Sequence, residues 1–267
     1  MSVTAAFDRA RAEGRAALVA YLPAGYPSVP GGIAAMRAVV DAGADLVEVG
    51  LPYSDPVMDG PVIQRATQAA LGAGCRTADV LRTVEAVVAA GAPVVVMTYW
   101  NPVERYGVDR FARDLAAAGG AGLITPDLIP DEAGEWLAAA DAHDLDRIFL
   151  VSPSSTDARL AATVACCRGF VYATAVMGVT GAREQTSQAA PELVRRVRAT
   201  GTTLPVGVGL GVRDRAQAAT VAGYADAVIV GSALVDALAS GPARLTELTA
   251  DLAAGIRAPL PPPPPSI

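Results

Sequence analysis

Three acidic residues stand out because they lie where burying a carboxylate would be costly or in a loop rich in glycine and proline. Glu48 interrupts the apolar run ADLVEV, and a Gly/Pro-rich loop with Asp55 and Asp59 follows directly. Burying an unpaired carboxylate is expensive, so we expect Glu48 to have a task. Poor solvation raises the pKa of a carboxyl group, which suits a general acid/base near neutral pH. The alternatives are a glutamate held by a buried partner and, for each aspartate, an ordinary helix cap.

The loop after Glu48 must fold back if Asp59 is to face the same substrate. This loop contains Pro52, Pro56 and Pro61, which restrict its backbone conformation. The sequence therefore indicates a loop with a defined shape that can bring a carboxylate back over the site. Paired carboxylates in different environments can take different protonation roles. Glu48 and Asp59 are therefore the candidate catalytic pair.

Three glycine-rich stretches occur late in the chain and are typical of phosphate binding. They are Met177–Thr186, Gly207–Asp214 and Gly231–Leu238. Glycines let backbone N–H groups approach an anion, and the start of a helix adds a favourable dipole. Gly231 and Ser232 precede an apolar helical pattern, so amides and a hydroxyl group would converge there. The sequence predicts a bound phosphate ester.

The elements that must position these residues alternate between β-branched runs and Ala-rich helical segments. Eight strand–helix units of this kind predict a (β/α)₈ TIM barrel, with its site at the loops after the strands and the phosphate at the loops after strands 6, 7 and 8. A doubly wound open sheet is the competitor, but no G-x-G-x-x-G turn follows the first strand. The expected strands are Ala17–Tyr21, Leu46–Val49, Val94–Tyr99, Ala121–Thr125, Arg147–Val151, Gly169–Ala173, Leu204–Val208 and Ala227–Val230.

Composition limits the remaining function classes. The 267 residues are 52% hydrophobic and carry a net charge of −6, which disfavours nucleic-acid binding. No apolar stretch is long enough to span a membrane, and no signal pattern opens the chain. Three cysteines without C-x-x-C spacing indicate a reducing cytosol, so we expect a cytoplasmic protein with neither disulfides nor a zinc site. The single histidine, His143, lies in a polar helix end, so a His–nucleophile pair or a metal site is not expected.

We expect one barrel domain over residues 1–257. The segment 258–267, APLPPPPPSI, is a proline run for which packing is not expected, and we interpret it as a disordered tail. A docking peptide for a proline-binding module is the alternative for this segment.

Several motifs together resemble the tryptophan synthase α subunit family. They are VEVGLPYSDPVMDGPVIQRA, TYWNPVERYG, GAGLITPDLIPDE, MGVTGAR and GVGLGV…GSA, in family order from about Tyr21 to the last helix. The resemblance implies a metal-free, cofactor-free retro-aldol cleavage of indole-3-glycerol phosphate to indole and glyceraldehyde 3-phosphate. It also implies an α₂β₂ complex with a tryptophan synthase β subunit that carries pyridoxal phosphate and receives the indole.

The resemblance assigns roles to individual positions. Glu48 would transfer the proton between the glycerol hydroxyl group and indole C3, and Asp59 would hold the indole N–H. Thr180 would help to close the site and position Asp59, while Tyr172 would line the pocket near the carboxylates. The phosphate-binding positions would be Gly181, Gly209, Gly231 and Ser232, and the indole slot would comprise Tyr21, Tyr99, Ile124, Leu150 and Val208.

Three positions depart from the family pattern, and they bear on pocket shape and loop closure. Val208 stands where phenylalanine is frequent, Pro126 occupies a usually small position, and the segment TAVMG lacks an arginine sometimes found there. The reaction assignment is unaffected by these departures.

Three other functions remain open at this point. A free-standing indole-3-glycerol phosphate lyase would share the catalytic residues, but the intact YSDPVMDG and NPVERYG loops favour a partnered subunit. A sugar-phosphate isomerase or epimerase would usually need a His, a Lys or metal ligands. A non-catalytic, phosphate-binding activator subunit would be expected to lack Glu48 or Asp59.

Overall fold

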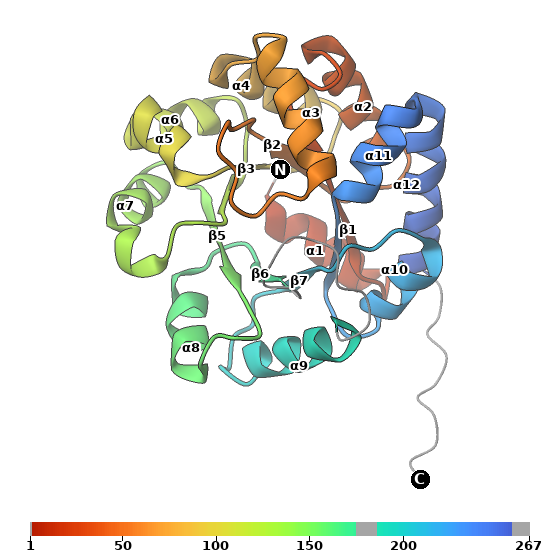
Figure 1. The fold of residues 1–267 in the computed structure, drawn as a ribbon. Helices are drawn as coiled ribbons and strands as arrows, with labels where there is room; N and C mark the ends of the chain where they lie inside the picture. Colours follow the sequence, from red (N-terminus) through yellow and green to blue (C-terminus); the bar gives the residue numbers. More distant parts are fainter. Residues whose placement is uncertain (1, 175–185, 258–267) are drawn as a thin grey trace.

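The computed structural model describes residues 2–174 and 186–257. Eight parallel strands form a closed barrel in the order β1 to β8, with β8 pairing back to β1. The helices form a ring around it (Figure 1). The strands are β1 Ala17–Pro23, β2 Leu46–Gly50, β3 Val94–Met97, β4 Gly122–Thr125, β5 Asp146–Val151, β6 Val171–Thr174, β7 Val206–Gly209 and β8 Ala227–Val230.

The helical ring contains more elements than one helix per strand. Extra helices accompany β2, β3 and β8, and α1 precedes the barrel. The helices are α1 Val3–Ala12, α2 Val29–Asp41, α3 Pro61–Gly72, α4 Thr77–Val88, α5 Trp100–Tyr106, α6 Val108–Ala117, the short 3₁₀ turn η1 Pro130–Glu132, α7 Gly134–Ala142, α8 Asp157–Cys166, α9 Thr186–Arg198, α10 Arg215–Ala222, α11 Ser232–Ser240 and α12 Pro242–Ile256.

The predicted barrel is confirmed, and the strand ends differ by one or two residues. The third strand stops at Met97 because Tyr99 already caps the N-terminus of α5. The seventh strand begins at Val206, since Pro205 has no N–H group to donate to the ladder. Neither change alters which residues lie at the C-terminal ends of the strands.

The connection into β2 shows how the sequence sets up the site. Ser28 caps α2 by accepting a hydrogen bond from the Gly31 N–H, and a proline occupies the first turn. The helix stops before Gly43, whose φ of +110° lies in the region that favours glycine. The chain then enters β2, where side chains alternate between the barrel interior and the helical ring.

Two hydrophobic clusters follow from this alternation. One lies between the strands and the helices and contains most of the core. The other fills the barrel interior, and α1 seals its N-terminal end. This interior cluster comprises Val3, Phe7, Ala10, Ala17, Val19, Leu46, Val95, Ile124, Ile148, Phe170, Ala227 and Ile229.

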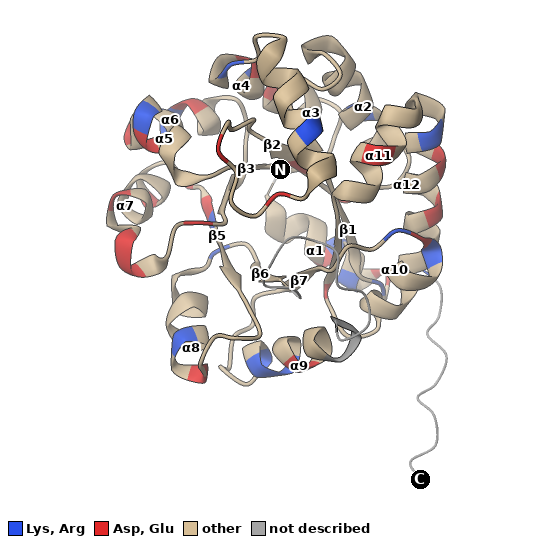
Figure 2. Ribbon diagram, viewed as in Figure 1, with Lys and Arg blue, Asp and Glu red and all other residues tan. Residues whose placement is uncertain are grey.

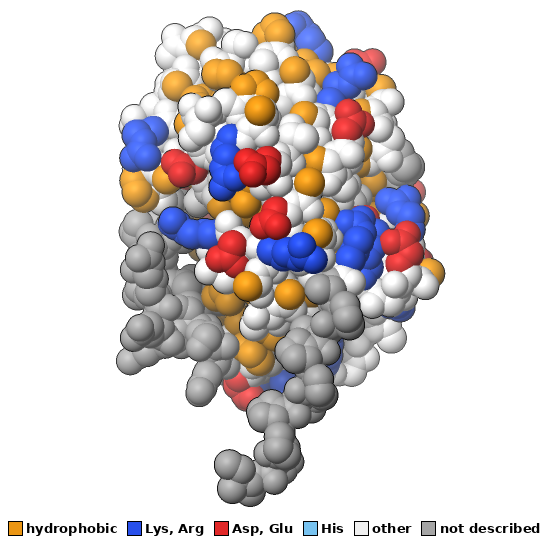
Figure 3. All heavy atoms as spheres, turned by 90° about the vertical axis from the view of Figure 1, so that its right-hand side faces the viewer, with side chains coloured by type: hydrophobic (Ala, Val, Ile, Leu, Met, Phe, Trp, Pro, Cys, Tyr) orange, Lys and Arg blue, Asp and Glu red, His pale blue; other side chains and the backbone are white. Residues whose placement is uncertain are grey.

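Charged residues lie mainly on the outer helices and loops, where water solvates them (Figure 2). On the face that carries α11 and α12, positive and negative side chains are interspersed (Figure 3). Among the described residues, one ion pair has both side chains buried: Arg15 donates two hydrogen bonds to Asp45, at 2.6 and 2.8 Å. None of the described helices combines the length and apolar character needed to cross a membrane.

Candidate active site

Glu48 lies in the barrel interior above Leu46, near the C-terminal end of β2. It has no exposed surface, and neither carboxylate oxygen has a hydrogen-bond partner among the described residues. Burial raises the pKa of the Glu48 carboxyl group from 4.5 to about 8. The group can therefore exchange a proton near neutral pH.

Two tyrosines face this carboxyl group, one from the neighbouring strand β1 and one from β6 on the opposite side of the barrel. Tyr21 is the register partner of Glu48 across the β1–β2 pair, and Tyr172 lies on β6. Burial raises the pKa of both phenols well above 10, and negative charge on Glu48 adds to the effect. Both phenols stay protonated at neutral pH, so the carboxyl group is the titrating member of this set.

Asp59 is held over the same mouth by Tyr99. The Tyr99 hydroxyl group donates to Asp59 Oδ1 at 3.1 Å and accepts from the Met58 N–H at 3.0 Å. Burial raises the pKa of Asp59, and the bond from Tyr99 partly offsets this. Burial likewise raises the pKa of Tyr99 to about 12. Negative charge on Asp59 also raises the pKa of Tyr21 in the barrel interior. The loop after β2 therefore folds back over the barrel, as predicted.

The loop after β2 is fixed at several points. The Tyr53 and Tyr99 rings lie 5.4 Å apart, and the Gln64 side-chain amide donates to the Asp59 carbonyl oxygen at 2.7 Å. Asp55 is exposed and accepts a bond from Ser54, so it does not join the carboxylate pair. Gly60 provides the N-terminal cap of α3, so Asp59 is not the helix cap.

The residues predicted for the indole slot do not all face the barrel interior. Ile124 belongs to the interior cluster, and Leu150 packs against it. Val208 instead faces the helical ring in the outer cluster, with no exposed surface. The assignment of Val208 to the indole slot is wrong, because Gly207 and Gly209 are the β7 residues that face inward.

The sequence analysis did not include Met97 among the pocket residues. In the structure, Met97 packs against the interior cluster at the C-terminal end of β3. The signal was available in the sequence, because alternation puts Met97 on the same side as Val95.

Gly209 ends β7 and Gly231 follows β8, and each has a structural role at its position. A Cβ atom on Gly209 would lie 2.6 Å from the Tyr172 hydroxyl oxygen, so a side chain there would displace Tyr172. Gly231 provides the N-cap of α11, and its carbonyl oxygen accepts from the Leu234 and Val235 N–H groups. The Ser232 N–H is at the first position of α11 and has no intrahelical partner, and among the described residues no side chain caps this helix, so these donors can face an anion.

Tyr21 joins the acidic and the glycine-lined parts of the site. A Cβ atom on Gly50 would lie 2.4 Å from its hydroxyl oxygen, and one on Gly231 would lie 3.3 Å from its ring. The structure thus brings together Glu48, Asp59 and the β8–α11 turn around one mouth. Thr180 and Gly181 lie outside the described residues, as does the proline run 258–267.

Comparisons with known proteins show which family the chain belongs to. The family model described as "Tryptophan synthase alpha chain" matches residues 7–257. The tryptophan synthase alpha chains of Salinispora arenicola and Mycobacterium tuberculosis are each 68% identical to this chain. The alignments cover 95% and 94% of this chain and 97% and 93% of those proteins.

Solved structures extend the similarity to the fold. A structure of Mycobacterium tuberculosis tryptophan synthase matches with a TM-score of 0.92 at 66% identity, covering 96% of this chain and 98% of that chain. A tryptophan synthase subunit alpha from Legionella pneumophila matches with a TM-score of 0.86 at 31% identity, covering 96% and 98%. The chain belongs to the tryptophan synthase alpha chain family.

Proposed function

We propose that this protein cleaves indole-3-glycerol phosphate to indole and glyceraldehyde 3-phosphate, as the α subunit of a tryptophan synthase. The observation that carries the proposal is Glu48, a fully buried carboxyl group with no hydrogen-bond partner among the described residues and a pKa of about 8. Asp59 and the open start of α11 lie around the same mouth.

Glu48 is the group that moves the proton. The carbon–carbon bond breaks when indole C3 is protonated and the adjacent glycerol hydroxyl group loses its proton to become the aldehyde. A single carboxyl group can take the hydroxyl proton and deliver one to C3, a contribution of about 10²–10⁴-fold. A carboxyl group whose pKa is near the working pH suits both halves of this transfer.

Asp59 is the group that stabilises charge. When C3 becomes tetrahedral, positive charge develops at the ring nitrogen, and a carboxylate near the N–H lowers the energy of that intermediate. Tyr99 orients Asp59 through the hydrogen bond at 3.1 Å. Tyr21, Ile124 and Leu150 offer the apolar surface on which the indole ring rests.

The phosphate group anchors a part of the substrate that does not react, which orients the bond to be broken. We assign this anchoring to the backbone at Gly181, Gly209 and Gly231 and to Ser232. We also assign to Thr180 a part in closing the site and positioning Asp59.

The absence of lysine from the whole sequence narrows the chemistry. Every one of the 21 basic residues is arginine, so no lysine side chain can form a Schiff base with a carbonyl substrate. Among the described residues, no three His, Cys, Asp or Glu side chains are grouped so that they could hold a metal ion. Direct protonation of an electron-rich ring is the cleavage that this residue set supports.

A β subunit is the proposed partner. The exposed large apolar side chains in the described parts of the chain are Val57, Met58 and Ile129, which are 73%, 38% and 40% exposed. They lie in the loops after β2 and β4, at the same mouth, where apolar exposure is typical of a docking surface. We propose an α₂β₂ assembly in the cytoplasm, with pyridoxal phosphate held only by the β subunit.

The test is indole release from indole-3-glycerol phosphate by the purified chain, with and without a tryptophan synthase β subunit. Glu48→Gln and Asp59→Asn should each abolish turnover. The exposed controls Glu85→Gln and Asp41→Asn should leave it unchanged. Strong acceleration by the β subunit supports the partnered enzyme, whereas fast turnover indifferent to it supports a free-standing lyase. Phosphate-ester binding without turnover in either condition would leave only a binding subunit.

A further inference from the structure

The Tyr21 hydroxyl group is a buried polar group to which the proposed proton transfer gives no role. Tyr21 is 8% exposed, and its hydroxyl group has no hydrogen-bond partner among the described residues. By contrast, the hydroxyl groups of Tyr53, Tyr99 and Tyr106 each hydrogen-bond another side chain. Burying a hydroxyl group without a partner costs about 1–3 kcal/mol. An apolar wall for the indole ring would be served by phenylalanine without this cost, so the hydroxyl group points to a contact with a ligand.

The Tyr21 hydroxyl group lies inside the barrel at the level of the last residue of β2. Tyr21 pairs with Glu48 across β1 and β2, and Gly50 is the next β2 position that faces inward. A Cβ atom on Gly50 would lie 2.4 Å from the Tyr21 hydroxyl oxygen. Burial raises the pKa of Tyr21, and negative charge on Asp59 and on Glu48 adds to the effect. The hydroxyl group is therefore close to both candidate catalytic carboxyl groups, on the side of Glu48 that faces the mouth.

The ring of Tyr21 lies beside the turn that we assign to the phosphate group. A Cβ atom on Gly231 would lie 3.3 Å from the ring carbon Cδ1, and Gly231 is the N-cap of α11. One side chain thus borders both the phosphate turn and the carboxyl groups. A substrate that is anchored at this turn and reacts at Glu48 passes alongside Tyr21. In the substrate proposed above, the part between the phosphate group and the reacting carbon is the glycerol chain with its hydroxyl groups.

We propose that the Tyr21 hydroxyl group donates a hydrogen bond to a hydroxyl group of the glycerol chain, which makes Tyr21 a specificity-determining residue. This inference rests on the function proposed above and adds a polar role to a residue whose ring borders the indole slot. The Tyr21 phenol stays protonated at neutral pH, so it remains a donor. A buried donor discriminates against a ligand that lacks the matching acceptor, because the donor is then left unpaired.

Two ligands isolate this contact from the others. Indole-3-glycerol phosphate has the ring, the chain hydroxyl groups and the phosphate group, whereas 3-(indol-3-yl)propyl phosphate has the same ring and phosphate group without the hydroxyl groups. Calorimetric titration measures both dissociation constants in the full chain carrying Glu48→Gln, so that the first ligand is not consumed. Adding Tyr21→Phe should weaken indole-3-glycerol phosphate by about threefold to tenfold and should not weaken the propyl phosphate.

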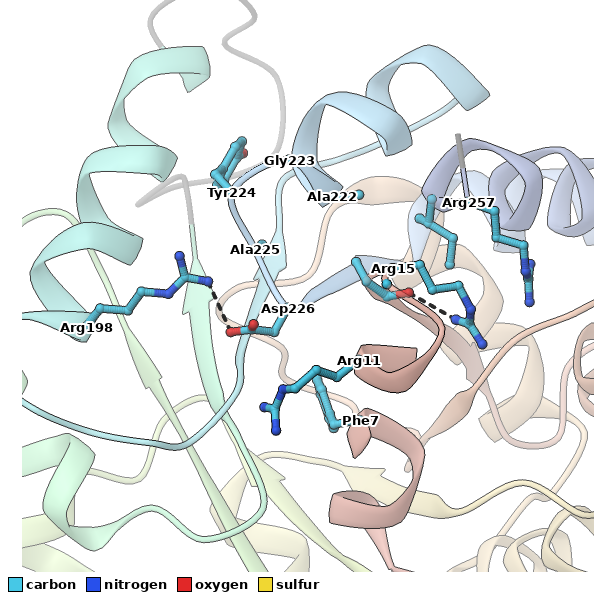
Figure 4. A pocket seen from close by; sticks show the side chains of 13 residues that line it. Phe7, Arg11, Arg15, Arg198, Ala222, Gly223, Tyr224, Ala225, Asp226 and Arg257 are labelled. Atoms are coloured by element: carbon cyan, nitrogen blue, oxygen red, sulfur yellow. Dashed lines mark hydrogen bonds and ion pairs between the residues drawn. The ribbon is translucent and has the colours of Figure 1, made fainter. Parts of the chain in front are cut away.

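Tyr224→Phe is the matched control, because it removes another phenol hydroxyl group without a partner among the described residues. Tyr224 lines a cavity at the opposite end of the barrel, together with Ala16 and Asp226, which immediately precede β1 and β8 (Figure 4). This control should leave both dissociation constants unchanged. Urea unfolding without ligand gives a second measurement. Tyr21→Phe should not lower the free energy of unfolding, since it removes a hydroxyl group that the free protein does not pair among its described residues.

The outcomes separate this inference from the proposed function. Equal binding of indole-3-glycerol phosphate with and without Tyr21→Phe would overturn the inference and leave the proposed function intact. Losses of the same size for both ligands, or a lower free energy of unfolding, would also overturn it, because the hydroxyl group would then act on the protein itself. A parent protein that binds neither ligand would overturn the proposed function and this inference together.

Discussion

Replacing Glu48 by glutamine removes a buried titrating group at nearly constant side-chain size, and we expect it to change how folding stability depends on pH. In the folded protein the pKa of Glu48 is raised from 4.5 to about 8 by burial. Between these values the unfolded chain releases the proton and the folded chain retains it. The contribution of Glu48 to the free energy of unfolding is therefore fully present below pH 4.5. It is lost as the pH rises toward about 8.

The magnitude follows from the size of this pKa shift. Each pH unit within the window changes the free energy of unfolding by about 1.4 kcal/mol per proton. The wild-type protein should therefore lose about 3 kcal/mol between about pH 5.5 and about pH 8 through this one group. Glu48→Gln has no proton to release, so its free energy of unfolding should exceed that of the wild type by an amount that grows with pH.

Urea unfolding, followed by far-UV circular dichroism at several pH values, measures this difference. The exposed control Glu85→Gln should give a curve parallel to the wild type. Parallel curves for Glu48→Gln and the wild type would refute the reasoning, because they would mean that Glu48 titrates alike in the folded and unfolded chains. A variant that is both more stable at high pH and catalytically inactive would show that the site is maintained at the expense of stability.

Three further substitutions test individual contacts. Tyr99→Phe removes the hydrogen bond that lowers the pKa of Asp59, so that pKa should rise and kcat/KM should fall about tenfold in steady-state assays across pH. Gly209→Ala places a methyl group against the Tyr172 hydroxyl group, so urea unfolding should show a loss of about 1–3 kcal/mol, and KM should rise. Arg15→Met leaves a buried carboxylate without its cation, and urea unfolding near neutral pH should show a loss of about 3–5 kcal/mol.

Matched controls accompany two of these substitutions. Gly72→Ala adds a methyl group where no atom lies within 4 Å, and it should not destabilise the protein. Arg82→Met removes an exposed arginine and should change the stability by less than about 0.5 kcal/mol. Full activity of Tyr99→Phe would contradict the role of its hydrogen bond to Asp59. For Gly209→Ala and Arg15→Met, a loss of unfolding free energy no larger than that of the matched control would contradict the contact that each substitution tests.

The sequence was sufficient to predict the barrel and the location of Glu48. Alternation along an apolar strand fixes which side chains face inward, and Leu46 and Glu48 follow that rule in the structure. The assignment of Val208 to the indole slot came from the family resemblance and not from alternation, and it is wrong because Val208 packs toward the helical ring. Without side chains on Gly207 and Gly209, nothing in the local sequence indicates which face of that strand is interior.

Contacts between residues far apart in the chain could not be predicted from the sequence. The hydrogen bond from Tyr99 to Asp59 joins residues 40 positions apart, and spacing along the chain does not encode it. The catalytic and phosphate-binding roles themselves stay predictions until the variants are measured.

The position of Tyr21 has a consequence for how this barrel can diverge in evolution. Its side chain lies where β1 pairs with both β2 and β8. It fills the space next to Gly50, at the end of β2, and next to Gly231, which follows β8. A bulkier residue at position 50 is incompatible with tyrosine at position 21, and one at position 231 is tightly restricted. The three positions should therefore covary, so that related barrels with a smaller residue at 21 are the ones that tolerate side chains at 50 or 231.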